Sequence, residues 1–243
     1  MNNTNTYINK SILGIFAHPD DETSGAGCTF TKFARMGANV TVITATRGEL
    51  GTLGTGDLSV SREQLPGVRE NELRQVLALF GANPPILLGY KDQEVQHEET
   101  EVIAGTLLNY MKRIEPDVVI TFGPQGISKH SDHIAIHNAS LSAFNFYKLD
   151  IAKKVNLLYI AIPESGAKEF DLDIDGPEIK PNVYVPARDD INVKIKAVRT
   201  YKSHEDAQEF AEWLKNSMDY YESFRLVGVD GDEPVAFEDL LAD

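Results

Sequence analysis

The sequence predicts an α/β protein of the Rossmann-like, doubly wound kind, with a mostly parallel sheet and helices on both faces. Three observations support this fold class. Short apolar runs rich in β-branched residues recur through the first half of the chain, and helical patterns separate them. The runs are apolar throughout rather than alternating, which is typical of strands buried on both faces of a sheet. Right-handed crossovers then arrange such units into layers.

The expected elements follow one another in a regular order. Four strands are expected at residues 12–17, 40–46, 86–89 and 118–122. Helical patterns lie between them: one that follows the first strand and ends at the glycine of Met36-Gly37, one over residues 68–82, and one from about 100 to 114. The third is expected to stop before Pro116. A loop, a helix over about 132–147 and a fifth strand at 157–162 complete this part.

The last third of the chain has a different pattern. The segment ESGAKEFDLDIDGPEIKPN is acidic and resembles a loop, and helices are expected near residues 192–201 and 205–221. The sequence shows no internal repeat. We therefore expect one domain over residues 1–243, in which about 164–243 elaborates the same fold.

Composition excludes several classes of function. The chain has 243 residues and a formal net charge of -14, which argues against nucleic acid and anionic membranes as partners. Its one cysteine, Cys28, excludes an internal disulfide, fits a helix core better than a nucleophile, and suits a reduced compartment. The polar start MNNTNTYINK resembles no leader, and no apolar run approaches ~20 residues. We expect a cytoplasmic protein, and a homo-oligomer stays open.

Two clusters of polar side chains follow the first and the fourth strands. The first strand ends in His18-Pro-Asp-Asp-Glu22, and TFGPQGISKHSDHIAIH spans the end of the fourth strand and the residues after it. In a doubly wound sheet with strand order 3-2-1-4, these two strands are neighbours at the reversal of strand order, and ligands bind beyond their carboxyl ends. The two clusters should therefore meet at one site.

The first cluster is typical of a metal site. His18 and Asp21 offer the nitrogen and oxygen donors that Zn²⁺ accepts, and a catalytic zinc needs three protein ligands and one position open to water. One histidine of the second cluster would complete the set, and Asp20 would remain as a general base. The alternative is that these acids cap the following helix. Capping does not explain His18 or three consecutive acids, so we favour the metal.

Spacing alone does not decide which histidine of the second cluster binds the metal. His133 and His137 are one helical turn apart and could share a metal, and His130 and His133 could lie on one side of a junction between loop and helix. His137 could equally be a core histidine. His97 and His204 have no partner nearby in sequence, and we interpret both as ordinary.

A glycine-rich loop, TRGELGTLGTGDLSVSREQLPG, follows the second strand. A dinucleotide fingerprint would follow the first strand and open a helix directly, so this loop is better interpreted as a mobile wall of the active site. Glu49 and Arg69 flank it and could contact polar substrate groups. For Arg69, an ion pair on the helix surface with Glu70 or Glu72 is an equal alternative.

The paired motifs resemble one known family. AHPDDE and KHSDHIAIH, supported by TRGELG and VRENELRQVLALFGA, are similar to motifs of the PIG-L/LmbE-type zinc-dependent de-N-acetylases, and the resemblance runs from about residue 12 to 147. It implies that His18, Asp21 and His133 bind the metal. It also implies that Asp20 is the general base.

The same resemblance assigns the remaining candidates. It implies that His130 stabilises the oxyanion and assists the leaving amine, and that Asp132 orients His130. Glu49 and Arg69 match positions that resemble sugar contacts, and His137 has no implied role.

The chain departs from the family pattern at two places. Ser131 stands where proline is usual, which removes no donor. In KAVRTYKSHED, Tyr201 and His204 stand where histidine and glutamine are usual. That region shapes the substrate pocket in the family, so the departure bears on which substrate is bound.

The resemblance implies a hydrolase that removes an N-acetyl group from an N-acetylglucosamine-type sugar or glycoside, giving a free amine and acetate. Its cofactor would be Zn²⁺, with Fe²⁺ as the alternative, and its partner a small N-acetylated sugar. One alternative is an amidase acting on a thiol-sugar conjugate. Another is a non-catalytic protein that binds metal or sugar, which the presence of both Asp20 and His130 disfavours.

Overall fold

A seven-stranded sheet forms the centre of the molecule. The computed structural model describes residues 6–217 and 220–242, so part of the polar start MNNTNTYINK lies outside the described residues. The strand order is β3-β2-β1-β4-β5-β7-β6. The strands are β1 (Ser11–Phe16), β2 (Asn39–Thr44), β3 (Ile86–Leu87), β4 (Val118–Thr121), β5 (Asn156–Ile160), β6 (Val183–Pro186) and β7 (Tyr221–Leu226).

The first five strands run parallel, and the predicted order 3-2-1-4 is confirmed. β1 pairs with β2 on one side and with β4 on the other. Among the described strands β7 alone runs in the opposite direction, because it is antiparallel to both of its neighbours. β1 and β4 are buried along their whole length, as uniformly apolar strands require. The predicted α/β fold class, with a mostly parallel sheet, is confirmed.

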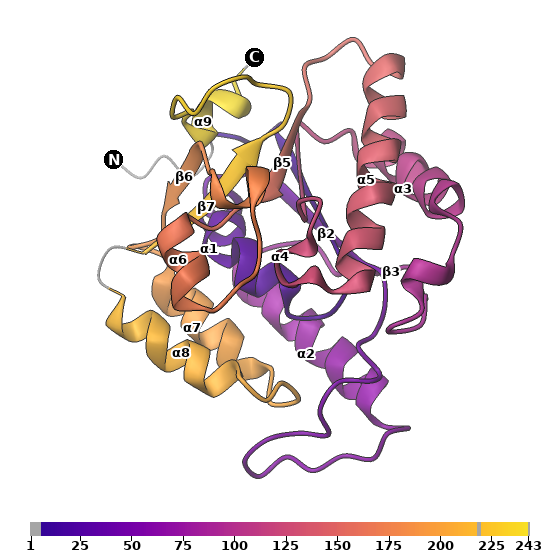
Figure 1. Ribbon diagram of the computed structural model, residues 1–243, viewed down its shortest axis with the longest axis vertical. Coiled ribbons are helices and arrows are strands. Elements are labelled where there is room, and N and C mark those ends of the chain that lie inside the picture. Colours follow the sequence, from indigo (N-terminus) through magenta and orange to yellow (C-terminus); the bar gives the residue numbers. More distant parts are fainter. Residues whose placement is uncertain (1–5, 218–219, 243) are drawn as a thin grey trace.

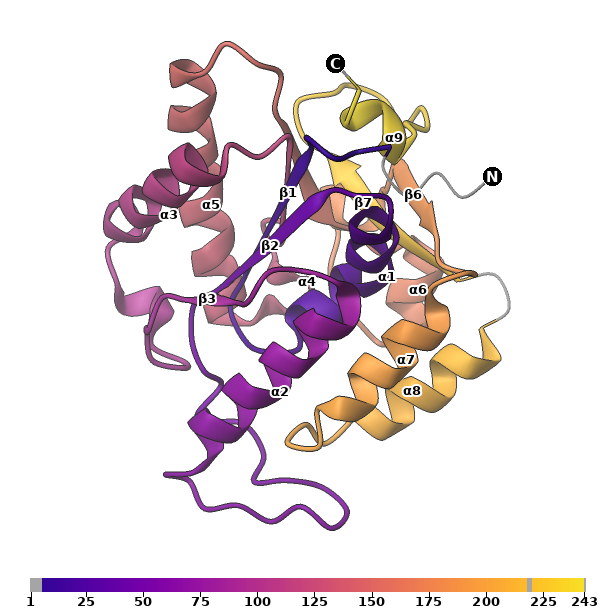
Figure 2. The same ribbon diagram turned by 180° about the vertical axis from the view of Figure 1, so that it is seen from behind.

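Helices cover both faces of the sheet (Figures 1 and 2). One layer contains α3 (Thr100–Ile114) and α5 (Ser131–Asp150), and the opposite layer contains α1 (Asp21–Arg35), α2 (Leu65–Phe80) and α7 (Ile191–Thr200). Shorter elements fill the connections: α4 (Gly126–Lys129), α6 (Glu164–Glu169), α8 (Ala207–Asn216), α9 (Phe237–Leu240) and the 3₁₀ turns Val95–His97 and Gly176–Ile179.

The long connection between β2 and α2 projects from one end of the molecule in Figures 1 and 2. Hydrogen bonds tie it to the turn after α7: Thr52 Oγ1 donates to the carbonyl of Ser203 at 2.6 Å, and Thr55 N donates to the carbonyl of Lys202 at 2.8 Å. A segment near the start of the chain is therefore joined to one near its end.

The C-terminal third differs most from the sequence-based expectation. The helix expected over 205–221 ends at Asn216 as α8, residues 218–219 lie outside the described residues, and Tyr221 opens strand β7. β6 was not expected, and the acidic segment contains α6 and a 3₁₀ turn. β7 has the sequence YESFRL. Its glutamate, Glu222, interrupts the apolar pattern expected of a buried strand, although its side chain is buried in the fold.

A buried ion pair joins this C-terminal part to α1. Glu222 of β7 is 2% exposed, and its carboxylate accepts hydrogen bonds from the backbone N–H groups of Cys28 and Thr29 at 2.8 and 2.7 Å. Those N–H groups are free because α1 is broken at Ala26, whose φ of -147° is not helical. Lys194 of α7 completes the pair at 2.7 Å. The helix that begins at the first motif therefore depends on the last strand of the sheet.

Within residues 6–217 and 220–242, no helix combines the length and the apolar composition that crossing a membrane requires.

Candidate metal centre and active site

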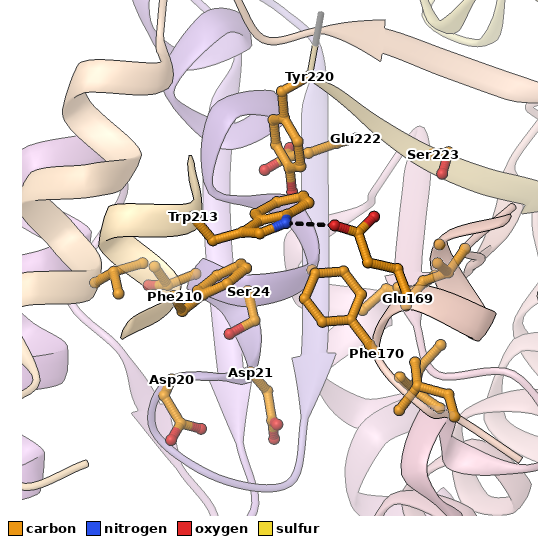
Figure 3. Close-up of a pocket in the computed structure, with 18 of the residues that line it drawn as sticks. Asp20, Asp21, Ser24, Glu169, Phe170, Phe210, Trp213, Tyr220, Glu222 and Ser223 are labelled. Carbon is orange, nitrogen blue, oxygen red and sulfur yellow. Dashed lines mark hydrogen bonds between the residues drawn. The ribbon is translucent and has the colours of Figure 1, made fainter. Parts of the chain in front are cut away.

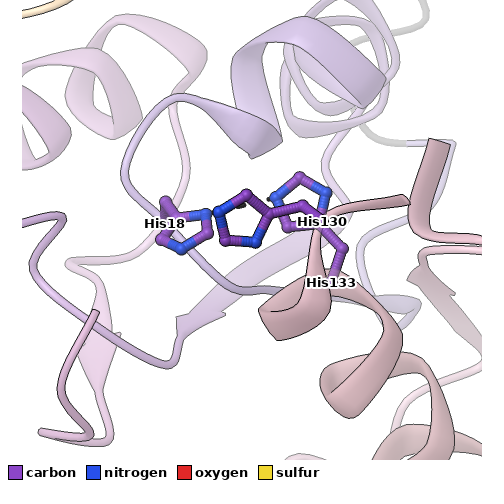
Figure 4. A group of neighbouring side chains, drawn as sticks. All are labelled: His18, His130 and His133. Carbon is purple, nitrogen blue, oxygen red and sulfur yellow. Dashed lines mark hydrogen bonds between the residues drawn. The ribbon is translucent and has the colours of Figure 1, made fainter. Parts of the chain in front are cut away.

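The loops after β1 and β4 meet at the carboxyl ends of their strands. Nδ1 of His18 lies 3.1 Å from Nε2 of His133, although 115 positions separate them in sequence. Asp21 joins them, with one oxygen 3.3 Å from His133 Nε2 and the other 3.6 Å from His18 Nδ1. Figure 4 shows the rings of His18, His130 and His133 gathered at one point. The expected meeting of the two clusters is confirmed.

In His18 and in His133, one ring nitrogen is occupied by partners outside the group of His18, Asp21 and His133, so the other ring nitrogen faces that group. Nε2 of His18 lies 3.1 Å from Asp132 and 3.2 Å from Asp92, so Nδ1 faces Asp21 and His133. Nδ1 of His133 contacts the carbonyl of Gly126 at 2.9 Å, which leaves Nε2. A carboxylate or carbonyl behind a histidine is the usual partner of a metal-ligating imidazole.

The spacing of these donors fits a tetrahedral cation. Ligand atoms about 2.0–2.2 Å from Zn²⁺ lie roughly 3.3–3.6 Å from one another in a tetrahedron. His133 Nε2 lies 3.1 Å from His18 Nδ1 and 3.3 Å from Oδ1 of Asp21, and the second oxygen of Asp21, Oδ2, lies 3.6 Å from His18 Nδ1. His130 also offers a nitrogen within 4.8 Å of His18 and His133. The cluster of histidines and aspartate can therefore hold a metal ion.

The electrostatics of the cluster also favour a cation. Burial alone would raise the pKa of Asp21, but His133 and His18 hold it well below 3.8. Burial would lower the pKa of His18, yet Asp132, Asp21 and Asp92 raise it well above 6.5. The carboxylates thus attract a positive charge, which a proton or a metal ion can supply.

Asp20 lies beside this centre in an unusual backbone conformation. Its φ of 114° is in the left-handed region that non-glycine residues rarely adopt, and such strain is found mostly at functional sites. Arg69 Nη2 and His204 Nε2 both contact Oδ2 of Asp20, at 2.8 and 2.9 Å. Both partners contact Oδ2, and no described residue forms a hydrogen bond with Oδ1. Oδ1 therefore remains available to water or substrate.

Arg69 is a buried partner of the first motif. It is 4% exposed and donates to the carbonyl of Pro19 and to Asp20. The surface pairs considered for Arg69 are wrong, because Glu70 pairs with Arg47 and Arg74 and Glu72 accepts from Ser203.

Two glycines of the long loop make room for Arg69. A Cβ at Gly48 or Gly51 would lie 2.2 or 2.6 Å from its Nη1. These two glycines therefore allow the loop to pack closely against the arginine. Leu50, Gly51 and Thr52 line the cleft beside the cluster, as expected for a wall of the active site.

His204 was expected to be ordinary, and that interpretation is wrong. It follows α7 and lies on Asp20, whose carboxylate raises the pKa of the imidazole above 6.5. Tyr201 reaches the same motif: its hydroxyl donates to Glu22 at 2.7 Å, and the other oxygen of Glu22 accepts the N–H of Asp20 at 3.0 Å. Tyr201 and His204, which depart from the family pattern near the C-terminus, therefore both contact the first motif.

Asp132 does not orient His130 through its side chain, contrary to the expectation. Its carboxylate contacts His18 and accepts the N–H groups of Gln93 and Val95 at 2.7 and 3.2 Å. Asp132 meets His130 through its backbone, because Asp132 N donates to His130 Nδ1 at 3.2 Å. The reason is the turn at the start of α5, which directs the two side chains to different neighbours.

A polar cleft of about 340 Å³ opens over these residues; we define it by His18, Thr52, Arg69, Asp92 and His130. Its walls are mainly charged or hydrogen-bonding groups, as a carbohydrate would require.

Glu49 was expected to contact polar substrate groups, but it does not line the polar cleft. Its carboxylate accepts the N–H groups of Asp92 and Arg47, each at 3.2 Å, and it supports the wall of the cleft.

His137 lies apart from the cluster. Its Nδ1 contacts the carbonyl of Phe122 at 2.9 Å, and its ring meets Tyr159 edge to face. It is a core histidine, which is the alternative considered for it. His97 is exposed, and Cys28 is buried in α1, as expected.

Two supporting residues were missed from the sequence. Asp92 follows β3, and the position of polar residues after a parallel strand could have identified it. Glu178 gave no such signal. Its carboxylate accepts the N–H groups of Gln125 and Ile127 at 2.6 and 2.8 Å and so fixes the loop whose Gly126 carbonyl holds His133.

Known proteins resemble this chain in sequence. The chain is 26% identical over 201 residues to a 1D-myo-inositol 2-acetamido-2-deoxy-alpha-D-glucopyranoside deacetylase of Salinispora arenicola, covering 73% of this chain and 65% of that protein. It spans 44–65% of the length of four curated relatives that it matches.

Solved structures extend the likeness beyond the first half. N,N'-diacetylchitobiose deacetylase from Pyrococcus horikoshii superposes with a TM-score of 0.69 at 26% identity, covering 90% of this chain and 84% of that one. GalB, a 4-carboxy-2-hydroxymuconate hydratase from Pseudomonas putida KT2440, has a TM-score of 0.70 at 17% identity, with 93% and 100% covered. That second likeness shows the fold alone.

The family comparison covers both motifs of the candidate site. The matching family model is PIG-L, described as GlcNAc-PI de-N-acetylase, and it spans residues 13–144, from β1 into α5. This segment contains the histidines and aspartates of the candidate metal cluster together with Arg69. The chain therefore belongs to the PIG-L family.

Proposed function

We propose that this protein is a metal-dependent hydrolase that removes an N-acyl group, acetyl in the simplest case, from an N-acetylglucosamine-type sugar. The observation that carries the proposal is that His18 Nδ1, His133 Nε2 and the carboxylate of Asp21 lie 3.1–3.6 Å from one another. A second carboxylate, that of Asp20, lies beside these three residues. Two of the proteins named above, those of Salinispora arenicola and Pyrococcus horikoshii, are deacetylases of acetamido sugars, which supports the same substrate class.

We assign the metal to His18, Asp21 and His133, with Zn²⁺ as the ion that their donor set favours and Fe²⁺ as the alternative. A divalent ion held there would polarise the amide carbonyl and lower the pKa of water. Asp92 and Asp132 would hold the ring of His18 and keep its proton on Nε2.

Asp20 is the proposed general base. Arg69 and His204 fix its Oδ2, so Oδ1 can take a proton from water as that water attacks the acyl carbon. The same carboxyl can then deliver the proton to the departing nitrogen. Arg69 therefore acts on the base in this proposal, in addition to lining the polar cleft.

His130 is the proposed donor to the developing oxyanion. Its Nδ1 accepts a hydrogen bond from Asp132 N, so a neutral ring carries its proton on Nε2. Burial and the neighbouring His18 and His133 lower the pKa of His130, which favours that neutral form. It therefore donates a hydrogen bond without needing a second proton.

Release of acetate from a panel of N-acetylglucosaminides, measured with metal content, tests the proposal. His133→Ala should lose both metal and activity, whereas His137→Ala, a histidine outside the cluster, should keep the metal. Full metal occupancy in His133→Ala would overturn the ligand assignment. A panel that also contains thiol-sugar conjugates separates the alternative amidase from the deacetylase. Absence of hydrolysis with metal bound would favour a binding protein.

A further inference from the structure

A second, larger space begins at the same aspartates and leads away from the polar cleft. It measures about 920 Å³ and lies between α6, α8 and the ends of β5 and β7. We call it the apolar cavity and define it by Ile127, Ile160, Phe170, Phe210 and Trp213. Pockets of about 300–1,000 Å³ enclose ligands of drug size, so this volume is sufficient for a substantial apolar group.

Aromatic rings form the far wall of the apolar cavity (Figure 3). Phe170, at the end of α6, meets Trp213 of α8 edge to face with centroids 4.9 Å apart, and Phe210 stacks on the same indole at 5.9 Å. The indole N–H donates to Glu169 at 2.8 Å, so its polar atom is already satisfied. Phe170 is 40% exposed although it belongs to this cluster. The wall therefore offers flat apolar surfaces with no unpaired indole donor.

The two spaces share the candidate catalytic centre. Asp20, Asp21 and His133 line both the polar cleft and the apolar cavity. Figure 3 shows Asp20 and Asp21 at one end of the apolar cavity and the aromatic rings at the other. A substrate whose reacting carbon lies at the metal cluster can therefore extend into both spaces.

The positions of His130 and Arg69 indicate which part of a substrate would enter each space. His130 and Arg69 line the polar cleft but not the apolar cavity. In an N-acylated amino sugar, the hydroxyls and the nitrogen lie on one side of the carbonyl and the acyl chain on the other. The sugar fits the side with hydrogen-bonding groups, so the acyl chain is directed toward the aromatic wall.

An acetyl group would leave most of this cavity unfilled. A methyl group fills roughly the 30 Å³ that a water molecule occupies in the liquid, a small part of 920 Å³. We propose that the apolar cavity is an acyl subsite, and that the enzyme hydrolyses amino sugars carrying medium-chain or aryl N-acyl groups. This inference rests on the proposed function. Water adds across the amide: its oxygen bonds to the acyl carbon, the C–N bond breaks, and both protons of the water end on the nitrogen, giving a carboxylate and an ammonium sugar.

A series of N-acyl glucosamines from acetyl to octanoyl tests the subsite through release of free amine by the metal-loaded enzyme. Complete burial predicts about a fourfold gain in kcat/KM per methylene, which corresponds to about 0.8 kcal/mol each. The cavity is partly open, so we expect at least about a tenfold gain from acetyl to octanoyl. Hydrolysis of the acetyl substrate with a decline for longer chains would overturn the subsite and leave the proposed function intact. Hydrolysis of none would overturn the proposed function.

A second arm places the chain on the other side of the carbonyl. Octyl N-acetylglucosaminide has an acetyl group and an apolar aglycone, and it should gain less than N-octanoylglucosamine. A larger gain for the octyl glycoside would show that the cavity receives the aglycone, and the acyl assignment would be wrong.

Trp213 supplies a readout that does not depend on turnover, because it is the one tryptophan of the chain. Octanoate, the carboxylate product, should change its fluorescence saturably at concentrations where acetate has no effect. Equal responses to octanoate and acetate would contradict the subsite.

Paired phenylalanine variants locate the effect. Phe170→Ala should lower kcat/KM for the octanoyl substrate about tenfold relative to acetyl, and its partial exposure makes the substitution tolerable to the fold. Phe146→Ala is the control, since Phe146 of α5 is 58% exposed and does not line the cavity. Equal ratios in the two variants would overturn the proposal.

Discussion

Breaking the buried pair of Lys194 and Glu222 should destabilise the protein unequally, depending on which partner is removed. Lys194 is 0% exposed, and its ammonium group contacts the carboxylate of Glu222 at 2.7 Å. It also donates to the carbonyl of Ser24 at 2.8 Å and to the hydroxyl of Tyr220 at 2.7 Å. Glu222→Gln would leave the ammonium with mainly neutral acceptors. Removing one partner of a buried pair costs about 3–5 kcal/mol, because the other charge stays buried.

Removing the lysine should cost less, because the carboxylate of Glu222 has other donors. The N–H groups of Cys28 and Thr29 and the hydroxyl of Thr29 all bind it within 2.8 Å. Lys194→Met keeps these hydrogen bonds and fills the space of the lysine stem, so we expect a loss of about 1–3 kcal/mol. For a chain of this size, 1 kcal/mol shifts Tm by about 2–4 °C. The predicted decreases in Tm are therefore about 6–20 °C for Glu222→Gln and about 2–12 °C for Lys194→Met.

Urea denaturation of both single variants and the double variant measures the asymmetry. The double variant removes both charges, so its free energy of unfolding should exceed the value expected from adding the single losses. An exposed pair provides the control: Lys215 and Glu212 are 2.8 Å apart on α8, and neutralising either should change stability by no more than about 0.5 kcal/mol. A larger loss for Lys194→Met than for Glu222→Gln, or strict additivity, would refute this reasoning.

Three further predictions concern the candidate site. Asp20→Asn should lower kcat/KM about 10²–10⁴-fold with unchanged metal content; loss of metal in this variant would make Asp20 a ligand instead. Asp132→Ala removes a partner of His18 Nε2 and should weaken metal binding about 10–100-fold, as measured by competition with a chelator; unchanged affinity would contradict that role. The pKa of His204 is raised by Asp20, so their ion pair stabilises the fold fully below pH 6.5, and this contribution disappears as pH rises through the raised pKa. His204→Gln should flatten the pH dependence of urea denaturation over that range, and an unaltered curve would exclude the ion pair.

The parallel half of the fold could be predicted because its signals are local. The strands around β1 and β4 are uniformly apolar, and α3 has the predicted bounds of 100 and 114. The meeting of His18 with His133 followed from strand order, which depends only on the alternation of strands and helices. These features require no knowledge of distant contacts.

The C-terminal third could not be predicted in the same way. β7 contains Glu222, which is polar in sequence and buried in the fold because Lys194 and the broken helix α1 surround it. His204 reaches Asp20 across 184 positions of sequence, and no spacing rule connects them. Glu178 supports the loop before His130 from a segment without a strong pattern of its own. In each case a long-range contact gives a polar residue its role.

The position of Glu178 links two properties that could otherwise vary separately. It follows the segment that contributes Phe170 and Leu172 to the apolar cavity, and its carboxylate fixes the loop whose Gly126 carbonyl holds His133. Substitutions that reshape this segment for a new substrate would therefore also move a ligand of the proposed metal. Lineages that diverge in substrate would be expected to retain an acceptor for the two N–H groups of that loop while the surrounding cavity residues change. In directed evolution, randomising residues 169–172 while Glu178 is kept should yield more metal-loaded variants than randomising residues 169–172 together with Glu178.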